Sequence, residues 1–536
     1  MNKKYKMLIF ILASLVILPL IVNSCAQPHV NTEKGNVQPS VNMENLEKTY
    51  TSPGLVEQSG SEHLISEPNN KVEKTIDVTK SPYNAVPNDG KDDTDAIQNA
   101  INDAAKIPGT KVYLPRGTYN LSNPTTKSSF LQLKSGVNLT GESKDTVILI
   151  ADADKISGST GIIEGMGVES ILISNFQVTS VKTSNGKYST DTEKPNPNAF
   201  GAQYNIWIGA NSKVASKNVV IENVGVENFK RGGIRIEKSH DTIVRKCSFS
   251  NATAVDGGGA GYGVVIQGTV KDSEQLGRYD DTYFNLVENC NFTGPYIRHG
   301  VLLQFYAHNN LVRNNSFDGT LLDSVDLHGE NEFLNEICDN NIKDVTKGGA
   351  IGVGNTGGIA PSNHSSSGPS NYIHDNVIEN CRDGISVIMG SPKTRIENNI
   401  IKNTSINNSK GIMLKNAPDT IVKNNIIENN MEKGFISIYI TKDEGDKSAN
   451  NLGAGEPKDD LIDGNKIRNN SNGIIVEAGN KISIFNNSIN DNLASTFTAI
   501  AIKDGNYISI KDNTLNNNTK GVSITGGEDI VNSNCP

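Results

Sequence analysis

One short pattern recurs through the second half of the sequence and limits the folds that the chain can adopt. It consists of an aliphatic residue, two mostly polar residues, Asn, any residue and then an apolar one, as in the run from Val312 to Phe317. Most successive copies start 22 to 26 residues apart. The fourth position is Asn in the eight clearest copies: Asn315, Asn340, Asn376, Asn399, Asn425, Asn465, Asn487 and Asn513.

A second motif lies between these copies and consists of Gly, an aliphatic residue, any residue and another aliphatic residue. Examples begin at Gly300, Gly384 and Gly473. Short strands that repeat in units of about 23 residues indicate a β-helix solenoid, whereas a β-propeller needs units of about 40 residues or more. Stacked rungs pair the backbone groups of neighbouring strands, and stacked Asn side chains can hydrogen-bond from rung to rung. The sequence therefore predicts an all-β parallel β-helix whose Asn column is structural.

The segment before the repeats predicts a cap for the open end of the solenoid. Ala96, Ile97, Ala100, Ile101 and Ala104 fall on one face of a helix. A helix laid over the first rung would cover strand edges that otherwise stay unpaired. We therefore expect a short N-terminal capping α-helix.

The same segment resembles the entry motif of the pectate-lyase-like superfamily, in the run from Asn88 to Gln98 (NDGKDDTDAIQ) and in the strand from Leu114 to Tyr119 (LPRGTY). Together with the repeats, the resemblance covers roughly residues 75–530. It implies a right-handed parallel β-helix that holds an extended carbohydrate in a groove parallel to its axis. Proteins of this kind include polysaccharide lyases, glycoside hydrolases, uronate epimerases and phage tailspikes.

The N-terminus is typical of an export signal, because three Lys precede an almost unbroken apolar run from Met7 to Val22. The end of this run resembles a bacterial lipobox. The resemblance implies that Cys25 is lipidated and anchors the exported protein to the cell membrane, facing outside the cytoplasm. The polar, Pro-containing stretch that follows has no sustained period and is typical of a flexible linker. The predicted parts are a signal at 1–25, a linker at 26–74 and the β-helix domain at 75–536.

Charge and cysteine content narrow the possible functions. The net charge is −9, and nucleic-acid binding needs clustered Lys and Arg, so we expect no nucleic-acid partner. The Cys residues after Cys25 match no disulfide or zinc pattern. Buried thiols without a metal are therefore expected at the first four of them: Cys247, Cys290, Cys338 and Cys381.

Outward side chains of stacked strands form columns along a β-helix, so aligned strands predict which residues share a groove. The first column is Arg235, Val265, Leu302, Asp326 and Gly352, and the second is Glu237, Gln267, Gln304, His328 and Gly354. Later rungs show no similar convergence of polar and ionisable residues. We therefore expect the groove to lie over these rungs.

Four of the eight His residues lie in the 89-residue window that ends at His328. Asp326 and His328 are two residues apart and so face the same side of a strand. Arg298 and His299 lie one rung earlier, and we predict that these four residues are catalytic. Six further residues are predicted to bind the substrate: Arg235, Glu237, Gln267, Gln304, Tyr306 and His308.

The Asp-x-His element is similar to that of mannuronan epimerases and related lyases, with Leu327 where those enzymes usually have Pro. The resemblance implies a lyase or C5-epimerase that acts on a uronate-containing polysaccharide. β-Elimination needs a cation that neutralises the carboxylate, a base that removes the C5 proton and an acid that protonates the leaving oxygen. Arg298 or Arg235 could be the cation, His328 or His299 the base, and Tyr306 or Tyr296 the acid.

Three further possibilities stay open. A Ca²⁺ ion held by Asp326 with Glu237 or Glu330 could replace the arginine as the cation. A glycoside hydrolase would need two carboxylates about 5 to 9 Å apart, which Asp326 could form with Asp323, Glu237 or Glu330, or which Asp280 and Asp281 could supply. A non-catalytic protein that binds glycan or cell wall would use the same groove without turnover.

Overall fold

The computed structural model describes residues 52–68, 72–155, 161–211, 214–268, 281–356 and 364–533. The predicted export signal, the predicted lipidation site Cys25 and most of the predicted linker lie outside these residues. No helix in these ranges is long and apolar enough to cross a membrane.

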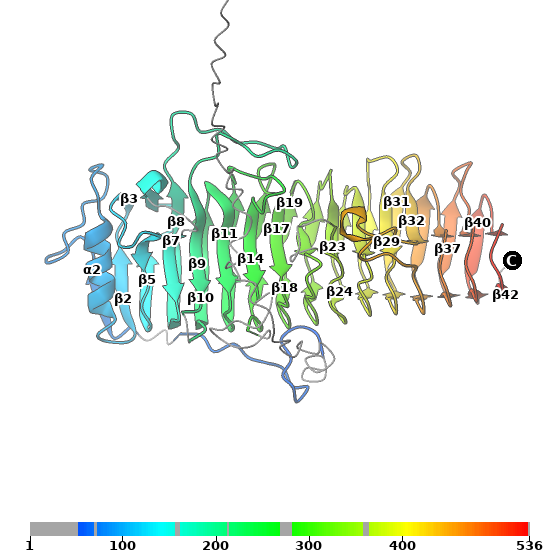
Figure 1. The fold of residues 1–536 in the computed structure, drawn as a ribbon, viewed down its shortest axis with the longest axis horizontal. Helices are drawn as coiled ribbons and strands as arrows, with labels where there is room; N and C mark the ends of the chain where they lie inside the picture. Colours follow the sequence, from blue (N-terminus) through cyan, green and yellow to red (C-terminus); the bar gives the residue numbers. More distant parts are fainter. Residues whose placement is uncertain are drawn as a thin grey trace, which may run out of the picture. The chain divides into compact units, whose positions relative to one another are not determined.

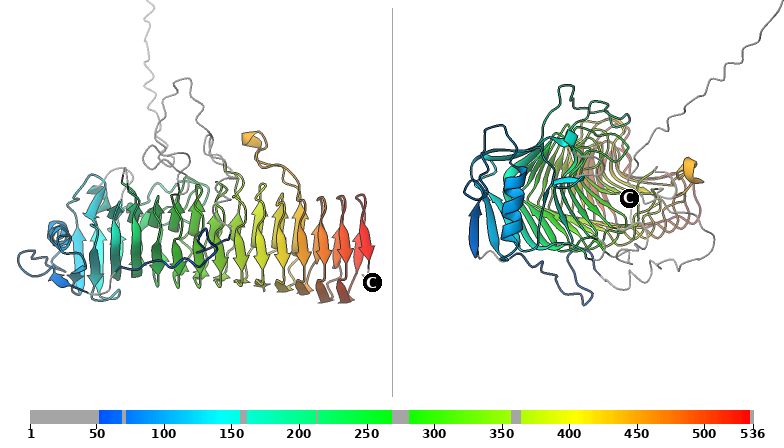
Figure 2. Two further views of the ribbon diagram at one scale, coloured as in Figure 1. Left: turned by 90° about the horizontal axis from the view of Figure 1, so that it is seen from below. Right: turned by 60° about the vertical axis from the view of Figure 1, so that its left-hand side comes forward.

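The described chain winds into a right-handed parallel β-helix, as the repeats predict (Figures 1 and 2). Each strand pairs in parallel with the equivalent strand of the next turn, which gives one 14-stranded and one 28-stranded sheet. The 14-stranded sheet consists of β4 (Ser129–Gln132), β7 (Gly161–Met166), β9 (Ala202–Gly209), β11 (Phe229–Glu237), β14 (Tyr262–Gln267), β17 (His299–Gln304), β20 (Val325–Leu327), β23 (Gly349–Val353), β26 (Asp383–Ile388), β29 (Lys410–Lys415), β32 (Ile436–Thr441), β35 (Ile474–Val476), β38 (Ile500–Ile502) and β41 (Val522–Ile524).

The 28-stranded sheet supplies the other walls of the solenoid. Its strands are β1 (Lys74–Asp77), β2 (Thr110–Leu114), β3 (Gly117–Leu121), β5 (Val137–Gly141), β6 (Val147–Ala151), β8 (Glu169–Ser180), β10 (Lys217–Val226), β12 (Thr242–Arg245), β13 (Ser248–Ser250), β15 (Leu286–Glu288), β16 (Asn291–Thr293), β18 (Leu311–Arg313), β19 (Ser316–Asp318), β21 (Glu336–Cys338), β22 (Asn341–Lys343), β24 (Tyr372–His374), β25 (Val377–Glu379), β27 (Arg395–Glu397), β28 (Ile400–Lys402), β30 (Ile421–Lys423), β31 (Ile426–Asn430), β33 (Leu461–Asp463), β34 (Lys466–Asn470), β36 (Ser483–Phe485), β37 (Ser488–Asn492), β39 (Ser509–Lys511), β40 (Thr514–Asn518) and β42 (Val531–Ser533). Two 3-10 turns, η1 (Ala153–Lys155) and η2 (Lys447–Ala449), lie in connections between strands.

The predicted Asn column runs along the bend between neighbouring strands of the 28-stranded sheet. Asn399 Nδ2 donates to Asn425 Oδ1 at 3.0 Å, and Asn425 Nδ2 donates to Asn465 Oδ1 at 3.0 Å. The same side chains also satisfy backbone groups, since Asn425 Oδ1 accepts from the Asn399 backbone N–H. The left-handed backbone angle falls one residue earlier, at Asn424 with a φ of 55°. The column is therefore structural, as predicted.

Helix α2 (Thr94–Ala104) closes the N-terminal end of the solenoid, as the apolar face predicts (Figure 2). Ile97, Ala100, Ile101 and Ala104 are fully buried and belong to the continuous core. The core continues through the inward aliphatic side chains of every later rung up to Ile510. These contacts fix the rungs on which the candidate site is built.

Residues 52–68 differ from the expected linker, because they lie against the outer face of the 28-stranded sheet (the blue segment at the lower edge in Figure 1). Leu55 and Ile65 pack on an apolar strip that crosses several rungs. Arg245 fixes the far end of this segment through a bidentate ion pair with Glu67, at 2.6 and 2.9 Å. Burial of apolar side chains together with this pairing explains why a segment without strand periodicity is docked.

Candidate active site

The columns predicted from the sequence are present on the outer face of the 14-stranded sheet. Arg235 pairs with Val265, Val265 with Leu302, Leu302 with Asp326, and Asp326 with Gly352. The second column runs from Glu237 through Gln267 to Gln304. Parallel register therefore places Asp326 beside Leu302 of β17, as expected.

Asp326 and His328 form a carboxylate–imidazole pair at the centre of these rungs. Asp326 Oδ2 lies 2.6 Å from His328 Nδ1, and the Asp326 side chain is 1% exposed. Burial alone would raise the pKa of Asp326, but the charge and the hydrogen bond of His328 outweigh it, so the pKa is lowered and the carboxylate is ionised. The carboxylate thus holds the proton on Nδ1 and leaves Nε2 as the basic nitrogen. Among the described residues, Nε2 has no hydrogen-bond partner.

His299 lies beside this pair in a neutral state. Burial, with a smaller contribution from Arg298, lowers the pKa of His299 to about 3. His299 Nδ1 donates to the backbone oxygen of Asp323 at 2.9 Å, and Nε2 accepts from Arg298 Nε at 3.3 Å. Because both ring nitrogens are engaged, His299 is better suited to positioning Arg298 than to removing a proton.

Asp323 completes the cluster with a second carboxyl group. Its Oδ1 accepts from the Gly349 N–H at 2.6 Å, and burial together with the nearby Asp326 carboxylate raises the pKa of Asp323 to about 8. Asp323 therefore holds a proton at neutral pH while Asp326 does not. Two carboxyl groups whose pKa values are pushed apart in this way can act as an acid and a base at one site.

The insert between β23 and β24 contributes side chains that sequence analysis did not assign. The His364 ring lies 4.3 Å from the His328 ring, centre to centre, and His364 Nδ1 lies 3.0 Å from Glu330 Oε1. Asn355 Nδ2 lies 3.0 Å from His328 Nδ1. Burial raises the pKa of Glu330 to about 8, so it too is protonated at neutral pH. The sequence signal that could have identified His364 is its place in the insert that follows the predicted groove strands.

Two loops cover the rest of the cluster. Arg298 Nη1 donates to the backbone oxygens of Thr192 and Val255, at 3.1 Å each, in the loops before β9 and β14. Beneath them, Val265 and Leu302 form an apolar cluster on the outer face that is separate from the core. The apolar members of the first column therefore pack under the loops, and His328, with 11% of its side chain exposed, is the more accessible member of the pair.

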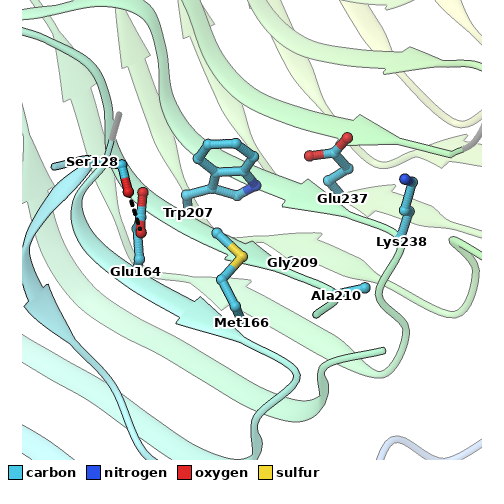
Figure 3. A pocket seen from close by; sticks show the side chains of 8 residues that line it. All are labelled: Ser128, Glu164, Met166, Trp207, Gly209, Ala210, Glu237 and Lys238. Atoms are coloured by element: carbon cyan, nitrogen blue, oxygen red, sulfur yellow. Dashed lines mark hydrogen bonds between the residues drawn. The ribbon is translucent and has the colours of Figure 1, made fainter. Parts of the chain in front are cut away.

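Arg235 and Glu237 belong to a second polar group, three rungs from Asp326. Arg235 Nη2 lies 3.0 Å from Glu237 Oε2, and its guanidinium carbon lies 4.5 Å from the centre of the Trp207 ring. Trp207, Glu164 and Glu237 line a hollow of about 360 Å³ (Figure 3). Gln267 joins this group to the middle of the sheet, since it accepts from both Arg235 and Gln304.

His308 is not in the groove, which corrects its predicted role in substrate binding. Its ring is fully buried between Tyr283 and Phe333, at centre-to-centre distances of 5.4 and 4.6 Å. Tyr306 is partly exposed and its N–H donates to the backbone oxygen of Glu330 at 3.0 Å, which keeps it next to the His328 cluster.

One of the two predicted calcium pairs, Asp326 with Glu237, is too widely separated for a single ion. Glu237 is three rungs away, about 14 Å at the spacing of parallel strands, so one ion cannot touch both carboxylates. His299, Asp323 and Asp326 do place donor atoms within 4.8 Å of one another, and Asp326 Oδ1 is buried without a hydrogen bond among the described residues. However, Ca²⁺ takes six to eight oxygen ligands, and here Arg298 already occupies the His299 nitrogen. The second predicted pair, Asp326 with Glu330, stays a prediction.

Residues 78–349, just over half of the chain, match the family model described as rhamnogalacturonase A/epimerase, pectate lyase-like. The chain belongs to this pectate lyase-like family. Residues 351–531 match a second family model, described as periplasmic copper-binding protein (NosD). No curated protein is significantly similar to the sequence. The candidate catalytic residues all lie within the pectate lyase-like match.

Solved structures of low sequence identity are similar to the chain, and the first of them shares its fold. A tailspike protein mutant of E. coli bacteriophage HK620, in complex with a pentasaccharide, is 14% identical over 88% of this chain and 82% of its own, with a TM-score of 0.53. A mannuronan C-5 epimerase, the AlgE6 A-module of Azotobacter vinelandii, is 16% identical over 85% of this chain and 99% of its own, with a TM-score of 0.47. A mannuronic acid-specific family 6 polysaccharide lyase from human gut microbiota is 11% identical over 81% of this chain and 87% of its own, with a TM-score of 0.48.

Proposed function

We propose that this pectate lyase-like protein acts outside the cytoplasm on a uronate-containing polysaccharide, as a lyase or C5-epimerase. The observation that carries the proposal is the His328 imidazole, whose Nδ1 is held by the Asp326 carboxylate at 2.6 Å while Nε2 has no partner among the described residues. The name of the matched family, which includes an epimerase, agrees with proton abstraction from a sugar. A carboxylate that holds one nitrogen of an imidazole orients the ring, so that the other nitrogen can act as the base.

The proposed reaction begins when His328 Nε2 removes the C5 proton of a uronate residue. The charge of Asp326 stabilises the imidazolium that forms, and Arg298 favours the negative charge that develops on the sugar carboxylate. In elimination, the C4–O bond then breaks, a C4–C5 double bond forms, and Asp323 or Tyr306 donates a proton to the leaving oxygen. In epimerisation, a proton returns to C5 from the opposite face and no bond between sugars breaks.

The first experiment screens the full-length protein against anionic and neutral polysaccharides. Ultraviolet absorbance of unsaturated uronates reports elimination, and solvent deuterium at C5 of intact polymer reports epimerisation. His328→Ala should lower the rate by about 10²- to 10⁴-fold, the usual contribution of a positioned base. Asp443→Asn is the matched control, because Asp443 is a buried acid paired with Lys415 at 3.2 Å on later rungs. Full activity of the His328 variant would refute the proposal.

A second candidate, glycoside hydrolysis, is favoured by the pair Asp323 and Asp326. One of these carboxyl groups is protonated and the other ionised at neutral pH, which are the states that an acid and a base need. Hydrolysis would release reducing ends without ultraviolet absorbance and would depend on Asp323 more than on His328. Retention of the protein on a glycan column without either product would instead identify a binding protein.

Location outside the cytoplasm and a lipid anchor on Cys25 are part of the same proposal. The apolar N-terminal run shortly before Cys25 and the periplasmic name of the second matched family support it. A polysaccharide too large to enter the cell would be reached only from this side.

A further inference from the structure

Three side chains of metal-ligand type meet on the outer face of the 28-stranded sheet, away from the groove. Glu336 and Cys338 are two residues apart on β21 and therefore point to the same side. His374 on β24 is the direct partner of Cys338 in the next rung. Their donor atoms, one carboxylate oxygen, the thiol sulfur and one ring nitrogen, all lie within 4.8 Å of one another.

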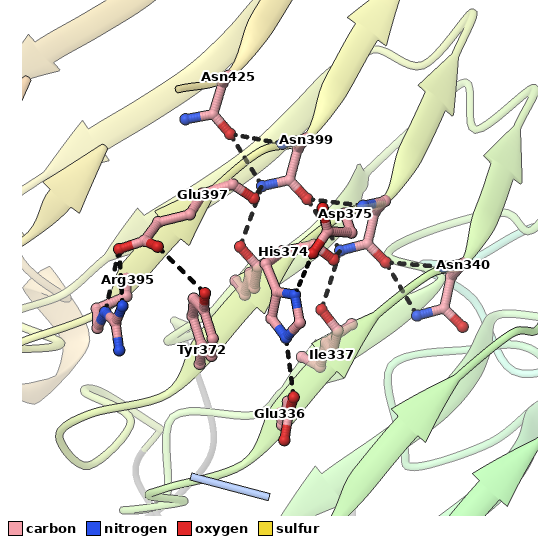
Figure 4. Close-up of polar contacts among 12 residues, drawn as sticks. Glu336, Ile337, Asn340, Tyr372, His374, Asp375, Arg395, Glu397, Asn399 and Asn425 are labelled. Atoms are coloured by element: carbon pink, nitrogen blue, oxygen red, sulfur yellow. Dashed lines mark hydrogen bonds and ion pairs between the residues drawn. The ribbon is translucent and has the colours of Figure 1, made fainter. Parts of the chain in front are cut away.

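The imidazole of His374 is oriented for a ligand by a second carboxylate. Asp375 Oδ2 lies 2.6 Å from His374 Nδ1, and Glu336 Oε1 lies 2.8 Å from Nε2 (Figure 4). The Tyr372 ring stacks on the imidazole at 4.0 Å. A histidine that binds a metal through one ring nitrogen usually donates the other N–H to a carboxylate in this way, which fixes the tautomer and the ring direction.

Cys338 differs from the other three described cysteines in where it lies. Cys247, Cys290 and Cys381 are members of the continuous core inside the solenoid, whereas Cys338 packs in the outer apolar strip with Leu55. An ion pair between Glu336 and His374 alone would need no thiol beside it. The thiol therefore adds a third donor of a kind that a purely ionic contact does not use.

The docked N-terminal segment shelters these donors. Gly54 lies so close to Glu336 that an added Cβ would stand 1.9 Å from Glu336 Oε2, and the Gly54 N–H donates to the backbone oxygen of Leu334 at 2.9 Å. Beside it, Glu336 lines a hollow of about 410 Å³ under the same segment. Glu336 is thus covered on one side by the segment and borders a hollow on the other.

We propose that Glu336, Cys338 and His374 bind a transition-metal ion of the Zn²⁺ type. One thiolate, one neutral imidazole and one carboxylate balance the charge of a divalent ion and match the ligands of zinc, whereas Ca²⁺ and Mg²⁺ prefer oxygen alone. In a tetrahedral site neighbouring donors are about 3.5 Å apart, which small rotations of these side chains can reach. A water molecule would complete the four ligands. Metal binding displaces the thiol proton and replaces the contact between Glu336 and His374.

Cobalt is the direct probe, because a Co²⁺–thiolate bond gives a near-ultraviolet charge-transfer band. The metal-free full-length protein is titrated with Co²⁺, and Zn²⁺ is then added to displace it. We expect one equivalent to give the band, with loss of the band in Cys338→Ser and retention in Cys381→Ser, a buried thiol inside the core. Asp375→Asn should weaken binding by about 10- to 100-fold, as for other residues that orient a ligand.

A protein without the band, or a Cys338→Ser variant that keeps it, would overturn the proposal. Thermal unfolding of each metal-free variant shows whether the substitution has disturbed the fold. Zn²⁺ should also raise the unfolding temperature of the native protein but not that of Cys338→Ser, a second readout that does not depend on cobalt. His328→Ala should keep the band, so failure of this proposal and failure of the proposed function are separable.

Discussion

Replacement of Asn425 by Ala tests the claim that the Asn column holds the solenoid together. Asn425 is fully buried. Its Oδ1 accepts from the backbone N–H of Asn399 at 2.9 Å, and its Nδ2 donates to the backbone oxygen of Ile396 at 2.9 Å. Removal of the amide leaves these two buried backbone groups without those partners.

The loss of stability depends on which buried hydrogen-bonding groups keep a partner after the substitution. The side-chain amide of Asn399 keeps its bonds to the backbone oxygens of Ile373 and Glu397, and Asn465 Oδ1 still accepts from the Asn425 backbone N–H. Only two buried groups therefore lose their partner, at about 1 to 3 kcal/mol each. The expected loss of stability is about 2 to 6 kcal/mol.

Asn424→Ala is the matched control, one residue earlier on the exposed side. It changes only the preference for the left-handed backbone angle, which costs about 1 kcal/mol. Denaturant unfolding measures the two variants side by side, and hydrogen exchange at the Asn399 amide reports the local opening. Equal stability of the two variants, or unchanged protection at Asn399, would refute the reasoning.

Three further outcomes are expected. Folding raises the pKa values of Asp323 and Glu330 to about 8. The folded state therefore binds more protons than the unfolded chain, and its stability falls as pH rises from about 4 to 8. Thermal unfolding across this range should show a shallower fall in Asp323→Asn than in the native protein. Arg245→Ala should free the docked segment, since it removes the ion pair with Glu67, and limited proteolysis should then cut within residues 52–68 faster than in the native protein. Cys25→Ala should abolish palmitate labelling and release the protein from membranes, whereas unchanged fractionation would exclude the anchor.

The fold was predictable because its determinants are local and repeated. Each rung carries its own Asn, such as Asn399 or Asn425, and its own pair of inward aliphatic residues, so one alignment of the sequence gave the strand register as well as the columns. The pairing of Leu302 with Asp326 and of Asp326 with Gly352 follows directly from that alignment.

The prediction from alternating strand residues was wrong where the backbone leaves the strand. Phe305 and Tyr306 both have positive φ angles, 52° and 60°, and two such residues in succession redirect the chain. The side chain of His308 therefore stacks between Tyr283 and Phe333, in the outer cluster on which Leu55 packs, instead of following Gln304. The docked segment and His364 could not be placed for a related reason. Their positions depend on contacts between residues far apart in the sequence, Glu67 with Arg245 and His364 with His328, and no period in the sequence encodes them.

The rung after the candidate site explains why its acid and base can lie so close together. Gly352 follows Asp326 in the outward column, and a Cβ there would come within 3.0 Å of Asp323 Oδ2. Gly349, on the same strand, donates its N–H to the other oxygen of that carboxyl group. A side chain at either position would push the protonated Asp323 away from the ionised Asp326. The absence of a side chain at Gly349 and Gly352 is therefore as much a part of the site as the carboxyl and imidazole groups around Asp326.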